Sequence, residues 1–182
     1  GQEKNVVNAA IAKMNLFLHG ASDFNVMQGD TLRDPKILQG GNIAKFDCVI
    51  ANPPFSLENW GATEWSSDKY KRNIYGTPSD SCGDYAWIQH MICSMSSGKG
   101  RMAVVMPQGI LFRGNQEAEI RKQLVESDLI EAVVTLGDKL FYGTGLSPCF
   151  LIIRRMKQAH HSGRILMIDG SKILTQKRAQ NI

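Results

Sequence analysis

The chain has 182 residues, of which 43% are hydrophobic and 21% are charged, and its formal net charge at pH 7 is +4. This length suffices for one domain with a real core, and the composition is ordinary for a soluble globular protein. No apolar run is long enough to span a bilayer, and the first residues do not form a signal peptide. The small positive charge permits a partner with a phosphate backbone without requiring one.

The cysteines and histidines form no pattern typical of a disulfide framework or a metal site. No two cysteines are closely spaced, and the histidines show no metal-ligand spacing. We therefore expect reduced, buried thiols in a cytoplasmic protein, with neither disulfides nor a metal site. The four cysteines are Cys48, Cys82, Cys93 and Cys149.

The first part of the chain predicts one helix and two strands. Apolar residues recur at helical spacing over residues 4–19, and Gly20 is a suitable C-cap. Residues 24–28 predict a short strand, and residues 31–45 a polar connection. The apolar run over residues 46–51 predicts a buried strand.

The most informative stretch, Asn52-Pro53-Pro54-Phe55, lies at the expected carboxyl end of that strand, where open α/β sheets place their ligands. The two prolines fix the backbone and remove two N–H donors, so the Asn52 side-chain oxygen and the Pro53 carbonyl make the loop rich in acceptors. Phe55 adds an aromatic face. An exocyclic amine on a planar base needs two acceptors and a stacking surface. We therefore favour an amine-binding site over a proline-stiffened turn.

Residues 56–83 are polar and aromatic without a steady period, and this length predicts a mobile functional loop or a lid. Trp60 and Trp65 fit contact with DNA and capping of the core equally well. The loop also carries a small basic cluster, which is by default a solvated surface, with phosphate contact as the alternative. Its members are Lys69, Lys71 and Arg72.

The remainder predicts alternating strands and helices. Helices are expected over residues 84–97 and 116–126, the second capped by Asn115. Strands are expected over residues 101–106, 129–136, 148–154 and 164–169. The second and third of these are separated by too few residues for a helical crossover, so we expect them to pair antiparallel at the sheet edge. The chain therefore predicts an α/β fold with a mostly parallel sheet and an antiparallel edge.

Several short landmarks follow one another in a fixed order. They are Gly1-Gln2-Glu3, Met14-Asn15-Leu16 with His19-Gly20, Gly29-Asp30-Thr31-Leu32, Asn52-Pro53-Pro54-Phe55-Ser56, the stretches 83–91 and 100–109, and Gly143-Thr144-Gly145-Leu146-Ser147-Pro148. The ordered set resembles the modification (M) subunit of type I restriction–modification systems, from Gly1 to about Asp169. The resemblance implies a Rossmann-like methyltransferase fold and adenine-N6 methylation of DNA with S-adenosylmethionine. It also implies three partners, namely double-stranded DNA, a specificity (S) subunit and a restriction (R) subunit.

The resemblance assigns roles to individual positions. Glu3 matches the acidic residue at the end of the second strand, which accepts hydrogen bonds from the cofactor ribose. Asp30 matches the acidic residue near the cofactor adenine. The stretch from Asn52 through Pro53 and Pro54 to Phe55 matches the target-base site, with Asn52 beside the cofactor as well. Taken alone, Glu3 and Asp30 would be interpreted as a solvated charge and a turn residue.

One feature of the family has no counterpart in this chain. Its glycine-rich cofactor loop should precede Gly1, so the resemblance implies that the N-terminal strands of the sheet are missing. Gly98-Lys99-Gly100 predicts a turn before a strand, and Gly143-Thr144-Gly145 comes too late to form this loop. We therefore expect residues 1–170 to be part of a catalytic domain that does not bind the cofactor normally by itself, followed by a polar tail over residues 171–182.

Three alternatives stay open from the sequence. The same acceptor loop suits methylation of a protein glutamine or of an RNA amino group, and an isolated fragment suits a non-catalytic interaction module.

A cytosine-C5 mechanism would need a nucleophilic cysteine. Cys149 follows Pro148, but it lies in an apolar run, so we expect it to pack in the core.

Overall fold

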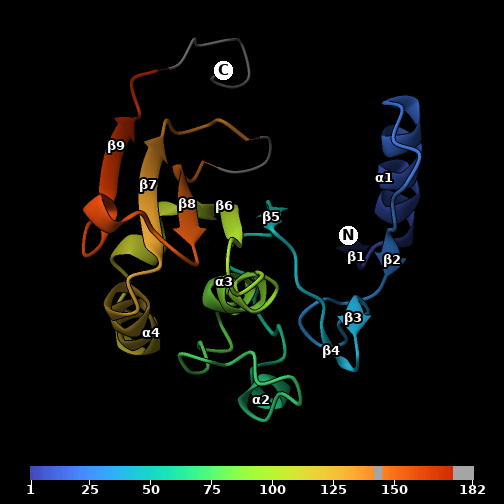
Figure 1. Ribbon diagram of the computed structural model, residues 1–182, viewed down its shortest axis with the longest axis horizontal. Helices are drawn as coiled ribbons and strands as arrows, with labels where there is room; N and C mark the ends of the chain where they lie inside the picture. Colours follow the sequence, from blue (N-terminus) through green and yellow to red (C-terminus); the bar gives the residue numbers. More distant parts are fainter. Residues whose placement is uncertain (142–144, 174–182) are drawn as a thin grey trace.

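A computed structural model of the chain describes residues 1–141 and 145–173. Its centre is a five-stranded sheet in the order β5-β6-β8-β7-β9 (Figure 1). The strands are β5 (Cys48–Ala51), β6 (Arg101–Pro107), β7 (Ile130–Leu136), β8 (Pro148–Arg154) and β9 (Leu166–Gly170). The pairs β5–β6 and β7–β9 are parallel, whereas β8 runs antiparallel to both β6 and β7. The expected antiparallel pairing of β7 with β8 is confirmed, but the pair does not form the sheet edge, because β8 lies between β6 and β7 and β9 pairs with the other side of β7.

Two small sheets precede the main one. The strand β1 (Gln2–Glu3) pairs in parallel with β2 (Met27–Gln28). The strands β3 (Leu38–Gln39) and β4 (Asn42–Ile43) form an antiparallel hairpin within the segment expected to be a polar connection. Gly40 and Gly41 make its two-residue turn, with φ angles of 58° and 78°. A two-residue hairpin turn with positive φ at both positions favours two glycines.

The helix α1 (Val6–Leu18) lies beside β1 and β2, apart from the five-stranded sheet (Figure 1). The Asn5 side chain caps its first turn by accepting from the N–H groups of Val7 and Asn8. The helix ends one residue before the predicted cap, because its C-cap is His19, and Gly20 follows with φ of 79° while the Ala21 N–H donates to the Leu16 carbonyl.

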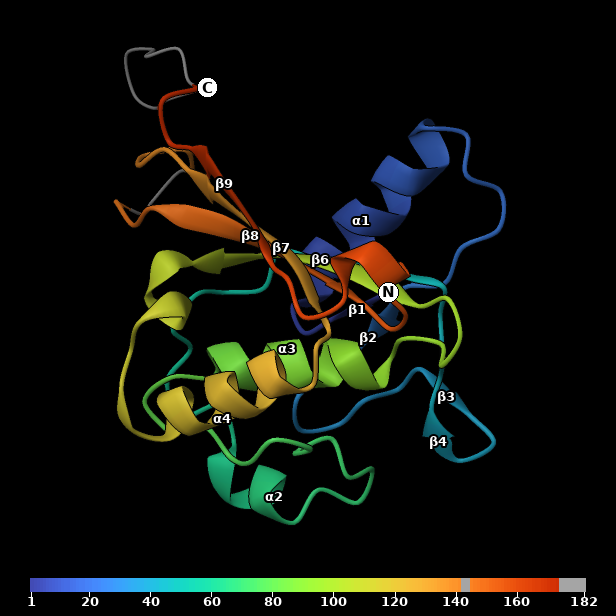
Figure 2. The ribbon, with the colours of Figure 1, turned by 60° about the vertical axis from the view of Figure 1, so that its left-hand side comes forward.

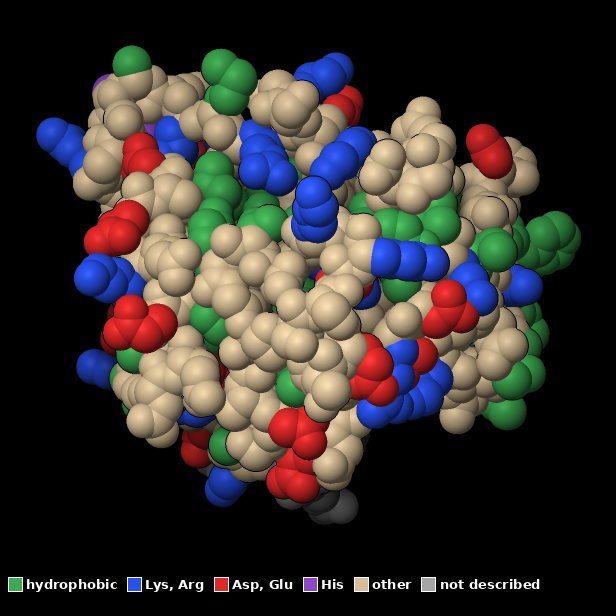
Figure 3. Space-filling view, turned by 90° about the horizontal axis from the view of Figure 1, so that it is seen from below, with side chains coloured by type: hydrophobic (Ala, Val, Ile, Leu, Met, Phe, Trp, Pro, Cys, Tyr) green, Lys and Arg blue, Asp and Glu red, His purple; other side chains and the backbone are tan. Residues whose placement is uncertain are grey.

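Apolar side chains cover the outer surface of α1. Ala9 is its only fully buried residue among those described. Figure 3 shows the exposed hydrophobic side chains at the right-hand end of the molecule, where α1 lies. The exposed large hydrophobic residues of α1 are Val6, Val7, Ile11, Met14, Phe17 and Leu18. Across residues 1–141 and 145–173, no helix combines the length and the apolar character that a membrane span requires.

The helices α3 (Asp84–Cys93) and α4 (Asn115–Glu126) lie side by side on one face of the main sheet (Figure 2). The core forms between these helices and the sheet, where Ile88, Ile92 and Ile153 are fully buried. The structure also contains two short 3-10 helices, η1 (Gln108–Leu111) and η2 (Ala159–His161). The predicted Asn115 cap is wrong, because the N-cap of α4 is Gly114 and no side chain caps that end.

The segment over residues 56–83 contacts the body of the protein through a few buried residues, while most of it is exposed or partly buried, and its role as a mobile loop or a lid stays a prediction. It contains the short helix α2 (Ala62–Ser66). Trp60 and Trp65 are each only 2% exposed, and their rings meet edge to face at 5.6 Å. With Leu32 and Ala86 they form a second hydrophobic cluster. Both tryptophans therefore cap the core, which is one of the two alternatives that the sequence left open.

Arg72 is buried, which corrects its assignment to a solvated or phosphate-binding cluster. Its side chain is 1% exposed, and it lies 2.7 Å from Asp68 in an ion pair. It also donates to the carbonyls of Thr31 and Leu32, at 2.9 and 2.7 Å. The guanidinium lies 4.5 Å from the centre of the Trp65 ring. Every donor direction of this residue is thus used within the protein, whereas the neighbouring lysines of the cluster are exposed.

Candidate active site

The loop Asn52-Pro53-Pro54-Phe55 begins at the carboxyl end of β5, as the sequence predicts. Asn52 and Pro54 are exposed, Pro53 is buried and Phe55 is partly buried. Among the described residues, none donates a hydrogen bond to the Asn52 carboxamide or to the Pro53 carbonyl. The exposed Asn52 carboxamide is therefore available to a ligand that approaches the end of β5, whereas Pro53 is buried and its carbonyl has no donor among the described residues.

A second aromatic residue stands beside this loop. The ring of Phe141 meets that of Phe55 edge to face, with 6.3 Å between the ring centres and an angle of 85° between the planes. Phe141 lies in the connection from β7 to β8, so the two rings come from distant parts of the chain. The sequence analysis did not select Phe141, although the landmark over residues 143–148 follows it closely. Residues 142–144, including the first two of Gly143-Thr144-Gly145, lie outside the described part of the chain.

The far end of the loop is tied to the amino end of α3. The Ser56 N–H donates to Asp84 Oδ1 at 2.8 Å, and the Gly83 N–H donates to the Leu57 carbonyl at 2.9 Å. Asp84 is fully buried, and its Oδ2 pairs with Arg113 at 2.7 Å. Sequence reasoning missed Asp84, because its partners lie 28 and 29 residues away along the chain.

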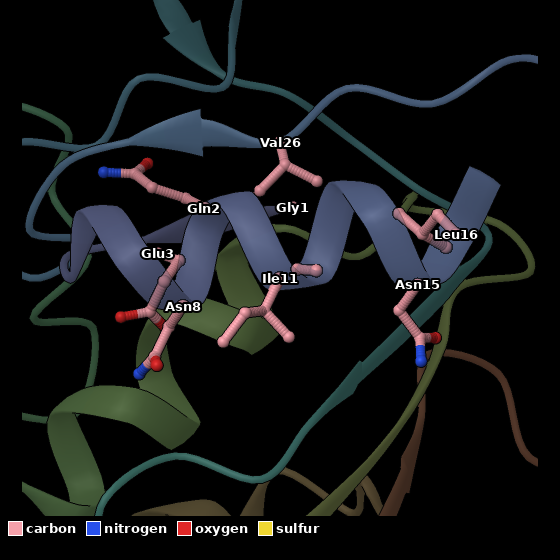
Figure 4. Close-up of a pocket in the computed structure, with 9 residues that line it drawn as sticks. Gly1, Gln2, Glu3, Asn8, Ile11, Asn15, Leu16 and Val26 are labelled. Atoms are coloured by element: carbon pink, nitrogen blue, oxygen red, sulfur yellow. The ribbon is translucent and has the colours of Figure 1, made fainter. Parts of the chain in front are cut away.

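Glu3 ends β1 and lines a cavity of about 590 Å³ beside α1. Its Oε1 accepts from the Asn5 N–H at 2.7 Å. Figure 4 shows the Glu3 and Asn8 side chains next to each other, with Ile11 and Asn15 on the same side of α1. The cavity therefore combines carboxylate and amide groups with an apolar wall.

Asp30 follows β2 and is largely occupied by interactions within the protein. Its Oδ1 accepts from the N–H groups of Leu32 and Arg33, and its Oδ2 lies 2.9 Å from Lys4 Nζ. Burial would raise the pKa of this carboxyl, but the hydrogen bonds from Lys4 and Arg33 outweigh it and hold the pKa below its ordinary value. Asp30 is thus a charged turn residue beside the adjacent strand ends of β1 and β2.

The structure does not bring the predicted residues into one cavity. The cavity at Glu3 is lined by neither Asp30 nor Asn52. A separate cavity of about 450 Å³ lies between the two regions, with Gly1 and Gln2 on one side and residues 48–51 of β5 on the other. Neither acidic residue nor the proline loop lines this second cavity, although their chain neighbours Gln2, Thr31 and Ala51 do.

The cysteines do not provide a nucleophile at this site. Cys149 is fully buried in β8, as expected, and burial raises the pKa of its thiol to about 11. Burial likewise raises the pKa of Cys82 to about 12, with the neighbouring acids adding to the effect. Cys48 is exposed, which corrects the expectation that it is buried. All four cysteines are free thiols.

The fold is similar to that of S-adenosylmethionine-dependent methyltransferases. A putative class I S-adenosylmethionine-dependent methyltransferase from Listeria monocytogenes has a similar fold, with a TM-score of 0.68 over 95% of this chain and 49% of that one, at 15% identity. The sequence narrows the class further, since the model of the N-6 DNA methylase family matches residues 1–182. The chain belongs to the N-6 DNA methylase family.

Its relatives include methylase subunits of type I restriction enzymes. The MjaVII methylase subunit of Methanocaldococcus jannaschii is 36% identical over 94% of this chain and 30% of its own length. The HindI methylase subunit of Haemophilus influenzae is 33% identical over 95% of this chain and 38% of its own length. A type I restriction-modification methyltransferase subunit from Streptococcus thermophilus has a TM-score of 0.88 and 32% identity, covering 100% of this chain and 38% of that one. The chain thus spans about a third of the length of the relatives that it matches.

Proposed function

We propose that this chain takes part in methyl transfer from S-adenosylmethionine to the N6 amine of adenine in DNA. The observation that carries the proposal is the loop at the end of β5, where two unoccupied acceptors stand beside an aromatic pair. Residues 1–170 would form part of the catalytic domain of a modification subunit. That subunit would act on double-stranded DNA together with specificity and restriction subunits, as in type I systems.

The residues present suit part of a cofactor site. S-adenosylmethionine would supply an electrophilic methyl group on a sulfonium. Glu3 is the better placed of the two acids to bind ribose hydroxyls, because it lines a cavity and keeps one carboxylate oxygen beyond the bond from Asn5. Asp30 has fewer acceptor positions left, so we propose that it lies near the adenine and holds the backbone turn over residues 30–33.

The proline loop would bind the target amine. A base inside a duplex must leave the stack before its amine can react, at a cost of about a few kcal/mol. Stacking on Phe55 or Phe141 would recover part of this energy. The Asn52 oxygen and the Pro53 carbonyl would accept the two N6 hydrogens, which localises the nitrogen lone pair and orients it for direct displacement. No covalent enzyme intermediate is required, which agrees with the buried, protonated thiol of Cys149.

The Asn52→Ala variant of the complete subunit tests this function. We expect methyl transfer to adenine in DNA to fall by roughly 100-fold or more, because one of two preorganised acceptors is lost. The affinity for S-adenosylmethionine, measured by calorimetry, should change by less than about twofold, since this substitution leaves Glu3 and its cavity intact. Asn25→Ala removes an exposed carboxamide outside the loop and serves as the matched control.

Near-normal turnover of Asn52→Ala would contradict the proposed mechanism. Parallel assays on DNA, RNA and protein substrates identify the acceptor. Transfer to RNA or to a protein glutamine in place of DNA would contradict the proposed substrate. Absence of transfer from the complete wild-type subunit would favour a non-catalytic interaction module.

A further inference from the structure

The loop that carries Asn52 is fixed at both of its ends. At the first end it continues from β5, which is held by parallel pairing with β6. At the second end, Ser56 adopts a left-handed conformation with φ of 50°, and its N–H points to Asp84. A non-glycine residue in this region of backbone space needs compensating contacts to hold it there.

Asp84 is suited to hold this backbone group because it is fully buried at the start of a helix. It is the first residue of α3, and its exposed fraction is 0%. The same helix carries Ile88 and Ile92, which are fully buried in the main core. The Gly83 N–H, one residue earlier, binds the Leu57 carbonyl and so adds a second connection between the loop and α3. The end of the loop is thereby joined to the most buried helix of the described chain.

Hydrogen-bond donors from two other residues surround the Asp84 carboxylate. Arg113 donates to Asp84 Oδ2 at 2.7 Å and to both oxygens of Glu117 at 2.9 and 3.2 Å. The Cys82 thiol also donates to Asp84 Oδ2, at 3.3 Å. A buried carboxylate is stable only when it is paired in this way. Because Oδ2 receives these bonds, Oδ1 remains available to the Ser56 N–H.

Only three residues separate Asn52 from Ser56, and two of them are prolines with a fixed φ. The position of the Asn52 carboxamide is therefore determined largely by the two anchored ends. We propose that Asp84 is a positioning residue for methyl transfer, which sets the place of the Asn52 and Pro53 acceptors by holding the Ser56 amide, with Arg113 as its support. This inference rests on the proposed function, because it assigns Asp84 a role in the same reaction.

Two variants at position 84 distinguish the loss of the hydrogen-bond acceptor from the loss of the negative charge. Asp84→Ala removes the acceptor of the Ser56 N–H and leaves Arg113 paired with Glu117. Asp84→Asn keeps one side-chain oxygen that can accept from the Ser56 N–H, while its NH2 group replaces Oδ2 and cannot accept from Arg113. Glu119→Gln removes an exposed carboxylate from α4 and is the matched control.

The first measurement is hydrogen exchange at the Ser56 amide, followed by NMR in this chain. We expect exchange to accelerate about tenfold or more in Asp84→Ala, as for the loss of a hydrogen bond to a charged group, while the Ile88 amide keeps its protection. In Asp84→Asn the change should stay below about threefold.

The second measurement is methyl transfer by the complete subunit. In Asp84→Ala, kcat should fall between about tenfold and 100-fold, as expected for acceptors displaced by a fraction of an ångström to one ångström, with the KM for the cofactor changed by less than about twofold. Asp84→Asn should recover most of the lost kcat, and Glu119→Gln should behave like the wild type.

Several results would overturn the positioning role. They are a wild-type kcat or an unchanged Ser56 exchange rate in Asp84→Ala, and equal losses of kcat in Asp84→Ala and Asp84→Asn. Faster amide exchange spread evenly over α3 in Asp84→Ala would also overturn it, because it would indicate a purely structural role. Failure of the proposed function would look different. The wild-type subunit would not methylate adenine, or Asn52→Ala would stay active, and the positioning role in methyl transfer would fall with it even if Ser56 exchange changed as expected.

Discussion

His90 provides a pH-dependent test of the packing around Arg72. The imidazole Nδ1 lies 3.2 Å from Arg72 Nη1. Arginine has no acceptor, so the guanidinium must be the donor and Nδ1 must carry no proton. Burial, with a further contribution from the Arg72 charge, lowers the pKa of His90 to about 3, although Asp68 acts in the opposite direction. The folded protein therefore requires a neutral His90.

The sign and size of the effect follow from proton linkage. The unfolded chain binds a proton at this histidine below pH 6.5, whereas the folded protein binds one only near pH 3. The unfolded state holds more protons between these values, so stability falls as the pH falls through this window. One proton corresponds to about 1.4 kcal/mol per pH unit, which gives a loss of about 2 kcal/mol between pH 8 and pH 5.

Urea unfolding at pH 8, 6.5 and 5, followed by tryptophan fluorescence, measures this loss. The informative variant is His90→Asn, because its side-chain oxygen can accept from Arg72 but cannot titrate. We expect the free energy of unfolding of this variant to lose about 2 kcal/mol less than the wild type over the same range. The matched control is His161→Gln at an exposed position, which should follow the wild type. Parallel pH dependence of wild type and His90→Asn would refute the reasoning.

Two further predictions concern stability. Arg72→Lys should lower the free energy of unfolding by about 2–4 kcal/mol, because the guanidinium donates to both Asp68 oxygens, to His90 and to two carbonyls, whereas an ammonium has only three donors. A loss below about 0.5 kcal/mol in urea unfolding would contradict this. Hydrogen bonds from Lys157 and from the Gly163 N–H lower the pKa of Asp128 to about 2, so its stabilising contribution is present above about pH 4 and lost as the pH falls toward 2. Asp128→Asn should therefore lower the Tm at pH 6 but not at pH 2, and equal melting shifts at both values would contradict the assignment.

The main strands could be predicted because their apolar runs are local signals. The strand β8 was predicted with its observed bounds, and β6 and β7 within one residue. The β3–β4 hairpin was not predicted, because each strand has only two residues and no alternating pattern develops. The Gly40-Gly41 pair was the available signal for it.

The errors share a physical cause, which is dependence on distant contacts. The sequence around Arg72 suggests a polar surface loop, but its carbonyl partners lie 40 and 41 residues earlier. Cys48 was expected to be buried because its strand is apolar. In the fold, Val49 and Ala51 pack against the core, while Cys48 and Ile50 point to the opposite face and are exposed.

The same distinction applies to the candidate site. The Asn52–Phe55 loop was predicted because four consecutive residues carry its chemistry. The partners that shape it, Phe141 and Asp84, come from other elements and carry no local signal. Residues 174–182 of the predicted tail lie outside the described chain, so that expectation stays a prediction.

The contacts of α3 have a consequence for the spacing of the reaction partners. One end of this helix holds the Ser56 backbone through Asp84, and the other end meets Arg72 through His90. Arg72 in turn holds the Thr31 carbonyl, directly after Asp30. The six-residue interval from Asp84 to His90 corresponds to about 9 Å of helix. Under the proposed function, α3 would set the distance between the Asp30 turn and the Asn52–Phe55 loop, and a substitution within α3 would change this distance without contacting either reactant.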